Sequence, residues 1–175
     1  MKPDPGRRAL LRGRPSFNSS EAIRPPWAVD ADRFIDICER CHDCIDVCPE
    51  SIIKRGDGGF PEVDFQRGEC TFCEKCAQVC SVAAFEPAPR DIEGAWHLVP
   101  SVRSSVCLSL NAVTCRVCGD RCEADAIRFR LHTGAMAEPL VDVDRCSGCG
   151  ACVFSCPVGA ISICAGNCST DSTSM

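Results

Sequence analysis

Cysteines are the residues of this chain whose type and spacing could do chemistry. There are 18 of them in 175 residues, and most fall into four short runs. Three runs have the spacing C-x₂-C-x₂-C-x₃-C and end at Cys48, Cys80 and Cys156, whereas the run that ends at Cys122 has Ala112 in place of its first cysteine. Three closely spaced thiolates on one loop can reach three irons of a [4Fe–4S] cluster, while the fourth thiolate points toward a neighbouring cluster. The spacing therefore indicates iron–sulfur chemistry.

Zinc and disulfides are the two other uses of clustered cysteines. Zinc sites usually have two C-x₂-C pairs about 12 to 20 residues apart, unlike these compact runs. Disulfide-dense chains are usually secreted, but the positively charged N-terminus has no apolar export region, because Leu10 and Leu11 are followed by Arg12 and Gly13. We therefore expect a cytoplasmic protein with reduced thiols that bind iron.

The elements that must position these cysteines can be read from two gaps, one between the first and second runs and one between the third and fourth runs. Each gap holds two strand-like segments around a glycine-containing turn, since glycine supplies the positive φ that such turns need. The first hairpin is expected from 52–54 and 61–65, and the second from 126–130 and 139–143. This pattern divides the chain into a basic, flexible N-terminal arm (1–32), a first module (33–86), a linker (87–102), a second module (103–164) and a disordered tail (165–175).

Composition excludes several classes of function. The net charge of −5 argues against a general nucleic-acid-binding role. No stretch approaches the roughly 18 apolar residues that would cross a bilayer, so no membrane span is expected. Leu, Ile, Val and Phe make up only about a fifth of the chain, which predicts a fold that depends on bound metal. There is neither a nucleophile–base pair nor a dinucleotide-binding loop, so we expect no enzyme activity.

Each module resembles the bacterial two-cluster [4Fe–4S] ferredoxin, and the fold class is accordingly expected to be α+β, with two such modules in tandem. In that family the fourth cysteine of each run binds the cluster of the other run. The resemblance implies four ligand sets. The first is Cys38, Cys41, Cys44 and Cys80; the second is Cys48, Cys70, Cys73 and Cys76; the third is Cys122, Cys146, Cys149 and Cys152; the fourth is Cys115, Cys118 and Cys156 with Cys107.

Cys107 is the least regular of these ligands. Seven residues separate it from Cys115, which gives a C-x₇-C spacing in place of C-x₂-C, but a longer loop adds little closure entropy. We expect four clusters, or three if Cys107 is a spare thiol. Cys164 and Cys168 lie beyond the last run and are interpreted as surplus thiols, the alternatives being a replacement ligand or a redox-sensitive pair.

Several further motifs extend the resemblance over nearly the whole chain. They are GRRALLRG at 6–13, IRPPWA at 23–28, GDGGFPEVDF at 56–65, GECTFCEKC at 68–76 and CEADAIRFR at 122–130. With the irregular third run, they resemble the NapF family, the ferredoxin-type accessory proteins of the periplasmic nitrate reductase system.

That resemblance implies a cytoplasmic iron–sulfur protein. Its partner would be the cytoplasmic precursor of the catalytic nitrate reductase subunit, which it would mature before export, for example by helping to assemble a [4Fe–4S] cluster. The alternative is a polyferredoxin that passes electrons between a soluble donor and a redox enzyme. Both functions use the same clusters.

Overall fold

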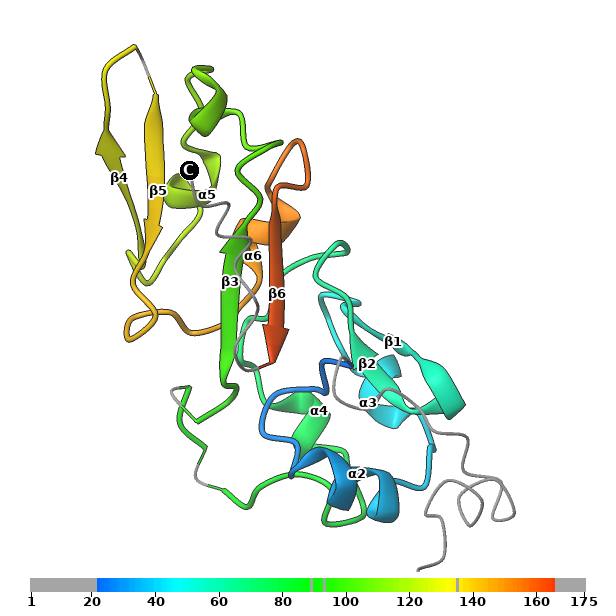
Figure 1. Cartoon of the computed structure of the whole chain (residues 1–175). Coiled ribbons are helices and arrows are strands. Elements are labelled where there is room, and N and C mark those ends of the chain that lie inside the picture. Colours follow the sequence, from blue (N-terminus) through cyan, green and yellow to red (C-terminus); the bar gives the residue numbers. More distant parts are fainter. Residues whose placement is uncertain (1–21, 89, 93, 135, 166–175) are drawn as a thin grey trace, which may run out of the picture.

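The computed structural model describes residues 22–88, 90–92, 94–134 and 136–165. Its elements in chain order are α2 (Ala31–Ile37), α3 (Asp43–Asp46), β1 (Ile53–Arg55), η1 (Asp57–Gly59), β2 (Pro61–Val63), α4 (Lys75–Gln78), β3 (Leu98–Val102), η2 (Ser109–Asn111), α5 (Val117–Asp120), β4 (Ile127–Leu131), β5 (Ala137–Val141), α6 (Ala151–Phe154) and β6 (Ile161–Ala165). Helices and strands are short and mixed. The elements from α2 to α4 lie at one end of the molecule, and those from β3 to β6 lie at the other (Figure 1).

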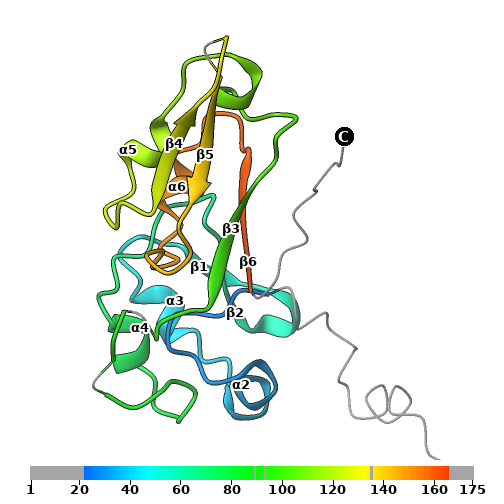
Figure 2. The ribbon, with the colours of Figure 1, turned by 60° about the vertical axis from the view of Figure 1, so that its left-hand side comes forward.

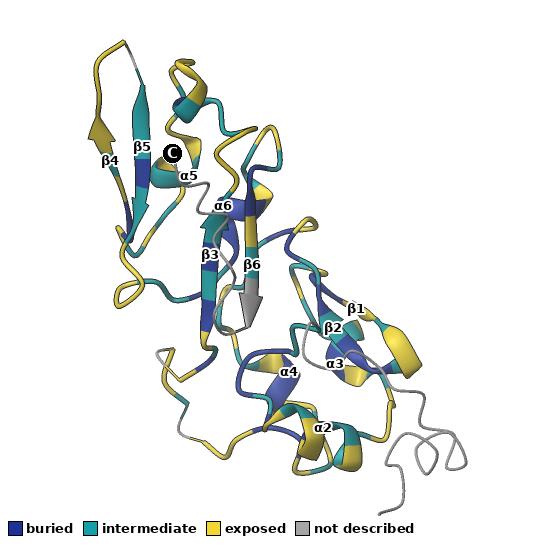
Figure 3. Ribbon diagram, viewed as in Figure 1, coloured by how far each residue is buried: buried dark blue, intermediate teal, exposed yellow. Residues whose placement is uncertain are grey.

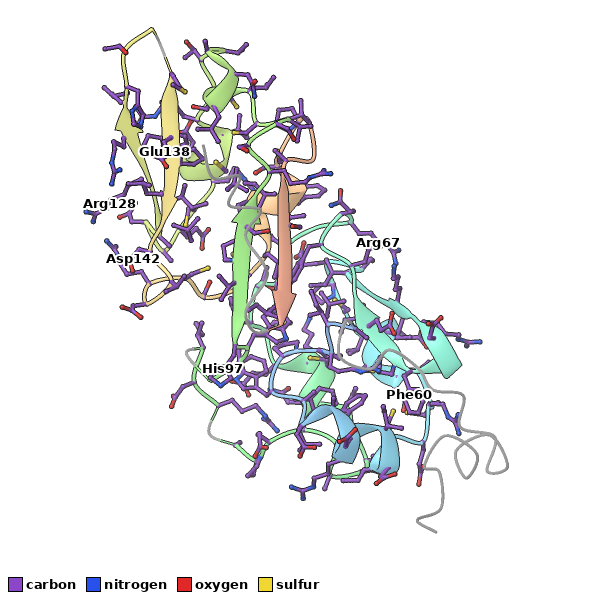
Figure 4. All side chains as sticks on the ribbon, viewed as in Figure 1. Phe60, Arg67, His97, Arg128, Glu138 and Asp142 are labelled. Atoms are coloured by element: carbon purple, nitrogen blue, oxygen red, sulfur yellow. The ribbon has the colours of Figure 1, made fainter. Side chains whose placement is uncertain are left out.

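Both expected hairpins are confirmed. β1 pairs with β2 and β4 pairs with β5, each antiparallel. Gly58 and Gly59 in the first turn and Gly134 in the second have positive φ, as the turn prediction required. After each hairpin the backbone N–H of an aspartate donates to the carbonyl before the first strand, Asp64 to Ile52 and Asp142 to Ala126, both at 2.8 Å. Asp142 is visible at the base of the second hairpin (Figure 4). The two modules therefore share one local design.

The start and the end of each module also pair with each other. In the second module β3 pairs along its whole length with β6, from Leu98 with Ala165 to Val102 with Ile161. Figure 2 shows these two strands side by side, with β3 extending toward the first module. In the first module the starting and ending segments pair in the same way, but only through a single antiparallel bridge between Ala28 and Phe85.

This pairing moves two boundaries relative to the sequence interpretation. Residues 98–102, assigned to the linker, form a strand of the second module, and residue 165 ends β6. Residues 22–32, assigned to the flexible arm, are packed against the first module. Trp27 and Pro25 are buried, and Val63 donates its backbone N–H to the Ile23 carbonyl at 2.7 Å. Residues 1–21 and 166–175, including the GRRALLRG motif at 6–13 and Cys168, lie outside the described residues.

The core is small and continuous. Its buried members come from both modules and include Phe34, Ile53 and Val63 from the first, and Ile127 and Ile161 from the second. Figure 3 shows the buried residues where elements face each other, while β4 is mostly exposed. In the described part of the chain no helix is long and apolar enough to cross a membrane. The core thus joins the two modules.

Candidate cluster-binding sites

The cysteine loops have an unusual backbone that suits an anionic ligand. In three of the four runs, the residue before and the residue after the second cysteine both have positive φ. These residues are Arg40 (60°) and His42 (73°), Phe72 (53°) and Glu74 (59°), and Gly148 (75°) and Gly150 (84°). Left-handed residues in a tight loop turn successive N–H groups into a concave nest, a device found at iron–sulfur and phosphate sites. Four of the six are not glycine, so the loops hold a conformation that L-residues adopt at some cost.

The first expected set meets in one place. Cys38, Cys41, Cys44 and Cys80 line a single cavity beneath α2 and α3. Burial, together with repulsion from the other three thiolates and from Cys76, raises the pKa of Cys44 to about 12. The structure therefore brings the last cysteine of the second run to the first loop, which is the crossing that the ferredoxin resemblance implies.

The second set shows the reciprocal crossing. Burial raises the pKa of Cys76 to about 12, and repulsion from Cys70, Cys73 and Cys48 adds to the shift. Cys48 comes from the first run and the others from the second. Cys73 and its counterpart Cys41 in the first run are exposed, whereas the third cysteines of the same runs are buried. In each of these two loops the second cysteine is therefore the exposed one.

The third set lies in the second module. Cys122, Cys146, Cys149 and Cys152 line one cavity. Burial, followed by repulsion from Cys149, Cys146, Cys118 and Cys122, raises the pKa of Cys152 to about 12. The last cysteine of the irregular third run therefore meets the fourth run.

The fourth set includes the irregular member. Cys107, Cys115, Cys118 and Cys156 line a cavity between η2, α5 and the end of the fourth run. Burial raises the pKa of Cys118 to about 11, and Cys107, Cys115 and Cys156 contribute by repulsion. The structure thus places Cys107 where a fourth ligand would stand, at the position that Ala112 leaves without a thiol.

The loop that carries Cys107 is fixed by polar contacts that sequence reasoning missed. The Asn111 side-chain amide donates to the carbonyls of Ser104 and Cys107 at 3.0 and 2.8 Å. The hydroxyl of Ser109, which is 3% exposed, donates to the Ala137 carbonyl on β5. These contacts replace the two left-handed residues of the other loops, since Arg116 has φ of −136°. The only sign of these contacts in the sequence was that polar residues, Ser109 and Asn111, follow Cys107 closely.

Arg24 is a second residue that sequence reasoning missed. Its guanidinium lies over the rings of Phe34 and Phe60, at 5.6 Å from each centroid, and 3.6 Å from a carboxylate oxygen of Glu62. Burial lowers its pKa, while the negative charges of Glu62 and Cys38 oppose that shift. A nearly buried positive charge therefore stands near the first set.

The residues present fit [4Fe–4S] clusters. In the described part of the chain, backbone N–H groups donate to cysteine sulfur from Phe72 to Cys70 (3.4 Å), from Ala126 to Cys122 (3.3 Å) and from Ala160 to Cys156 (3.2 Å). Such bonds stabilise thiolate ligands and tune a cluster. The raised thiol pKa values mean that metal binding would displace protons. When bound, a [4Fe–4S] cluster accepts or donates one electron.

Two alternatives for the cysteines can be compared with this geometry. The sixteen cysteines of the four sets are all free thiols rather than disulfides. In that same part of the chain, no three His, Cys, Asp or Glu side chains are grouped to hold a single metal ion. A cubane needs one thiolate at each of four iron corners, so its ligands stand further apart than those of one ion. Ligation by the four sets remains a prediction.

Comparison with known domains defines the class of protein. Residues 37–84 match the 4Fe-4S dicluster domain, and residues 139–162 match the 4Fe-4S binding domain. The first match covers the loops of the first two runs, and the second covers the fourth run. The chain is therefore a ferredoxin-type iron–sulfur protein with 4Fe–4S domains.

Comparison with whole proteins narrows the class to a family. The ferredoxin-type protein NapF of Escherichia coli (strain K12) is 43% identical over 161 residues, which cover 92% of this chain and 95% of that protein. NapF of Haemophilus influenzae is 46% identical over 166 residues, or 90% and 92% of the two chains. The chain belongs to the NapF family. The methylamine utilization ferredoxin-type protein MauM of Methylobacillus flagellatus is more distant, at 30% identity over 169 residues, 89% of this chain and 72% of that one.

Proposed function

We propose that the chain binds four [4Fe–4S] clusters through sixteen cysteines, in the four sets that were expected from the ferredoxin resemblance. The observation that carries this proposal is the crossing of ligands. Each set combines thiols from two runs that are far apart in sequence, and the fourth set is completed by Cys107. Burying four thiols at one place costs free energy that a bound metal centre offsets. Metal analysis tests the number, with about 16 iron and 16 sulfide per chain for four clusters and about 12 of each for three.

We further propose that this is a cytoplasmic accessory protein of the periplasmic nitrate reductase system. It would act on the precursor of the catalytic subunit before export and help to assemble its [4Fe–4S] cluster. Membership of the NapF family supports this role, as does the resemblance of the arm and the third run to that family. The protein would bind its client rather than catalyse a reaction of its own, since it has no candidate nucleophile–base pair.

The competing function is electron transfer between a soluble donor and a redox enzyme. Two observations favour keeping it. Cys41 and Cys73 are exposed residues, so electrons could enter or leave near them. In addition, the related MauM protein is named for methylamine utilization, a process other than nitrate reduction. The two functions differ in their client, which is an unmatured apoprotein in one case and a working enzyme in the other.

Anaerobic purification of the tagged full-length protein from cytoplasm separates these functions. Recovery of a nitrate reductase precursor that still carries its export signal and is poor in iron would support maturation. Recovery of a mature redox enzyme in its place would favour electron transfer. Cys41→Ser should lower both cluster content and client activity, whereas Cys168→Ser, which changes a cysteine outside the four sets, should change neither. Full cluster content in Cys41→Ser would contradict the ligand assignment.

A further inference from the structure

The two modules meet through their cysteine loops. The backbone N–H of Cys70, in the second set, donates to the carbonyl of Cys149, in the third set, at 2.8 Å. Cys70 also lines the same cavity as all four thiols of the third set. Burial raises the pKa of Cys70 to about 12, and the Cys149 thiolate of the other module is among the charges that add to this shift. The second and third sets are therefore direct neighbours.

The sequence of the fourth run permits this close approach. Gly148 and Gly150 occupy the left-handed positions that carry Phe72 and Glu74 in the second run. A Cβ atom at Gly150 would overlap the ring of Phe65 in the first module, and one at Gly148 would lie 3.2 Å from Leu98 Cβ. Since glycine is needed here for space as well as for φ, this loop is shaped to receive the other module.

Other contacts hold the modules in this position. Arg121 donates to the carboxylate of Glu69 across the boundary, with an N–O distance of 3.1 Å. The Trp96 ring, just before β3, packs edge-on against Phe65 and Phe72 of the first module, with centroids 5.6 and 5.8 Å away. A salt bridge of this exposure contributes little alone, but the aromatic contacts fix the relative orientation.

We propose that the Cys70–Cys149 contact is an electron-transfer junction that joins the two modules into one redox chain. The inference rests on cluster binding by the second and third sets. With clusters bound, the centre held by one of these two sets would be oxidised by one electron and the centre held by the other would be reduced by the same electron. No bond forms or breaks and no proton moves. The two sets within each module are also neighbours. Cys76 of the second set lies near Cys44 of the first, and Cys118 of the fourth set lies near Cys152 of the third.

The test uses the iron-loaded full-length protein. A flash-photoreduced deazaflavin delivers less than one electron per chain, and freeze-quench EPR follows its redistribution among the clusters. We expect Gly150→Ala to slow this redistribution several-fold, because the added Cβ displaces Phe65 and separates the loops. Gly134→Ala is the matched control. Its φ of +79° imposes similar strain, but a Cβ there meets nothing within 4 Å.

Arg121→Glu provides a second disruption, because it places like charges across the junction and leaves the 148–150 loop unchanged. Arg121 directly precedes Cys122 of the third run, so the cluster content of this variant needs the same check. Iron and sulfide are measured first, which separates a failure of cluster binding from a failure of the junction. If Gly150→Ala binds less iron than the wild type, the rate of redistribution in the Arg121→Glu protein decides whether the junction carries the electron. Redistribution as fast as in the wild type, in variants with full iron content, overturns the proposal.

Discussion

A buried residue follows the last cysteine of every run at the same distance. Ile52, Ala84, Ala126 and Ala160 each lie four residues after that cysteine and are at most 2% exposed. At Ala126 and Ala160 the backbone N–H donates to the cysteine sulfur, so the side chain must be held close beneath the loop. The four runs thus share a buried position at the same distance after the last cysteine, where the chain packs against the core.

Ala84 offers a direct test of this packing. Ala84→Leu would add bulk to a fully buried position, and overpacking of this kind costs about 1–3 kcal/mol. The adjacent Ala83 is exposed, so Ala83→Leu is a matched control that should leave stability unchanged. Anaerobic thermal unfolding of the two iron-loaded variants measures the difference. Equal midpoints would mean that the loop does not rest on Ala84.

Cys107 can be tested at the same scale. Cys107→Ser should lower the iron content from about 16 to about 12 per chain, because one cluster loses its fourth ligand. Ser109→Ala should have a smaller effect in the same direction, since it removes the bond that ties this loop to β5. About 12 iron per chain in both the wild type and Cys107→Ser would mean three clusters, whereas about 16 in both would show that Cys107 is not the fourth ligand.

At the scale of elements, the segment before the first module and the segment between the modules contact each other through two tryptophans. Trp27 is buried, donates its indole N–H to the Asp91 carbonyl at 2.8 Å and packs edge-on against Phe72. The Trp96 indole donates to the Arg24 carbonyl at 2.9 Å. Each tryptophan therefore ties one of these segments to the other.

Replacement of Trp27 measures how much these contacts contribute to the free energy of unfolding. Trp27→Ala should lower the free energy of unfolding by about 3–5 kcal/mol, the usual cost of removing a buried large aromatic ring. Trp27→Phe keeps a ring and loses the hydrogen bond, so it should cost only about 1 kcal/mol. Anaerobic denaturant unfolding compares the two. A small loss in both variants would show that the arm segment is dispensable.

The sequence was informative where structure is local. Cysteine spacing and glycine turns predicted the runs and both hairpins, because their partners lie close along the chain. The strand at 98–102 was assigned to the linker because Pro100 reads as a breaker. In a two-stranded sheet every strand is an edge, and an edge tolerates proline. The pairing of Pro100 with Ile163 joins distant segments, and no local pattern reports it. The same holds for Arg24, whose role depends on Phe34 and Phe60.

At the scale of the whole molecule, metal and core depend on each other. The buried core is thin, and several buried thiols lie in groups that repel one another when ionised. Removal of iron by an anaerobic chelator should therefore unfold the chain, because the binding free energy of the metal is part of the folding free energy. Far-UV circular dichroism before and after chelation tests this, and an unchanged spectrum would contradict it.

The pairing of the first and last strands of the second module also determines the order in which the two modules can fold during synthesis. The thiols of the first two sets are all synthesised once residue 80 has been added, and the bridging Phe85 follows shortly after. The third and fourth sets wait for Cys152 and Cys156, and β3 has no partner until β6 is made. Domains generally fold as units from the N-terminus during synthesis. The first module can thus mature while the second is still a nascent chain, and it then presents a finished surface on which the later cysteine loops assemble.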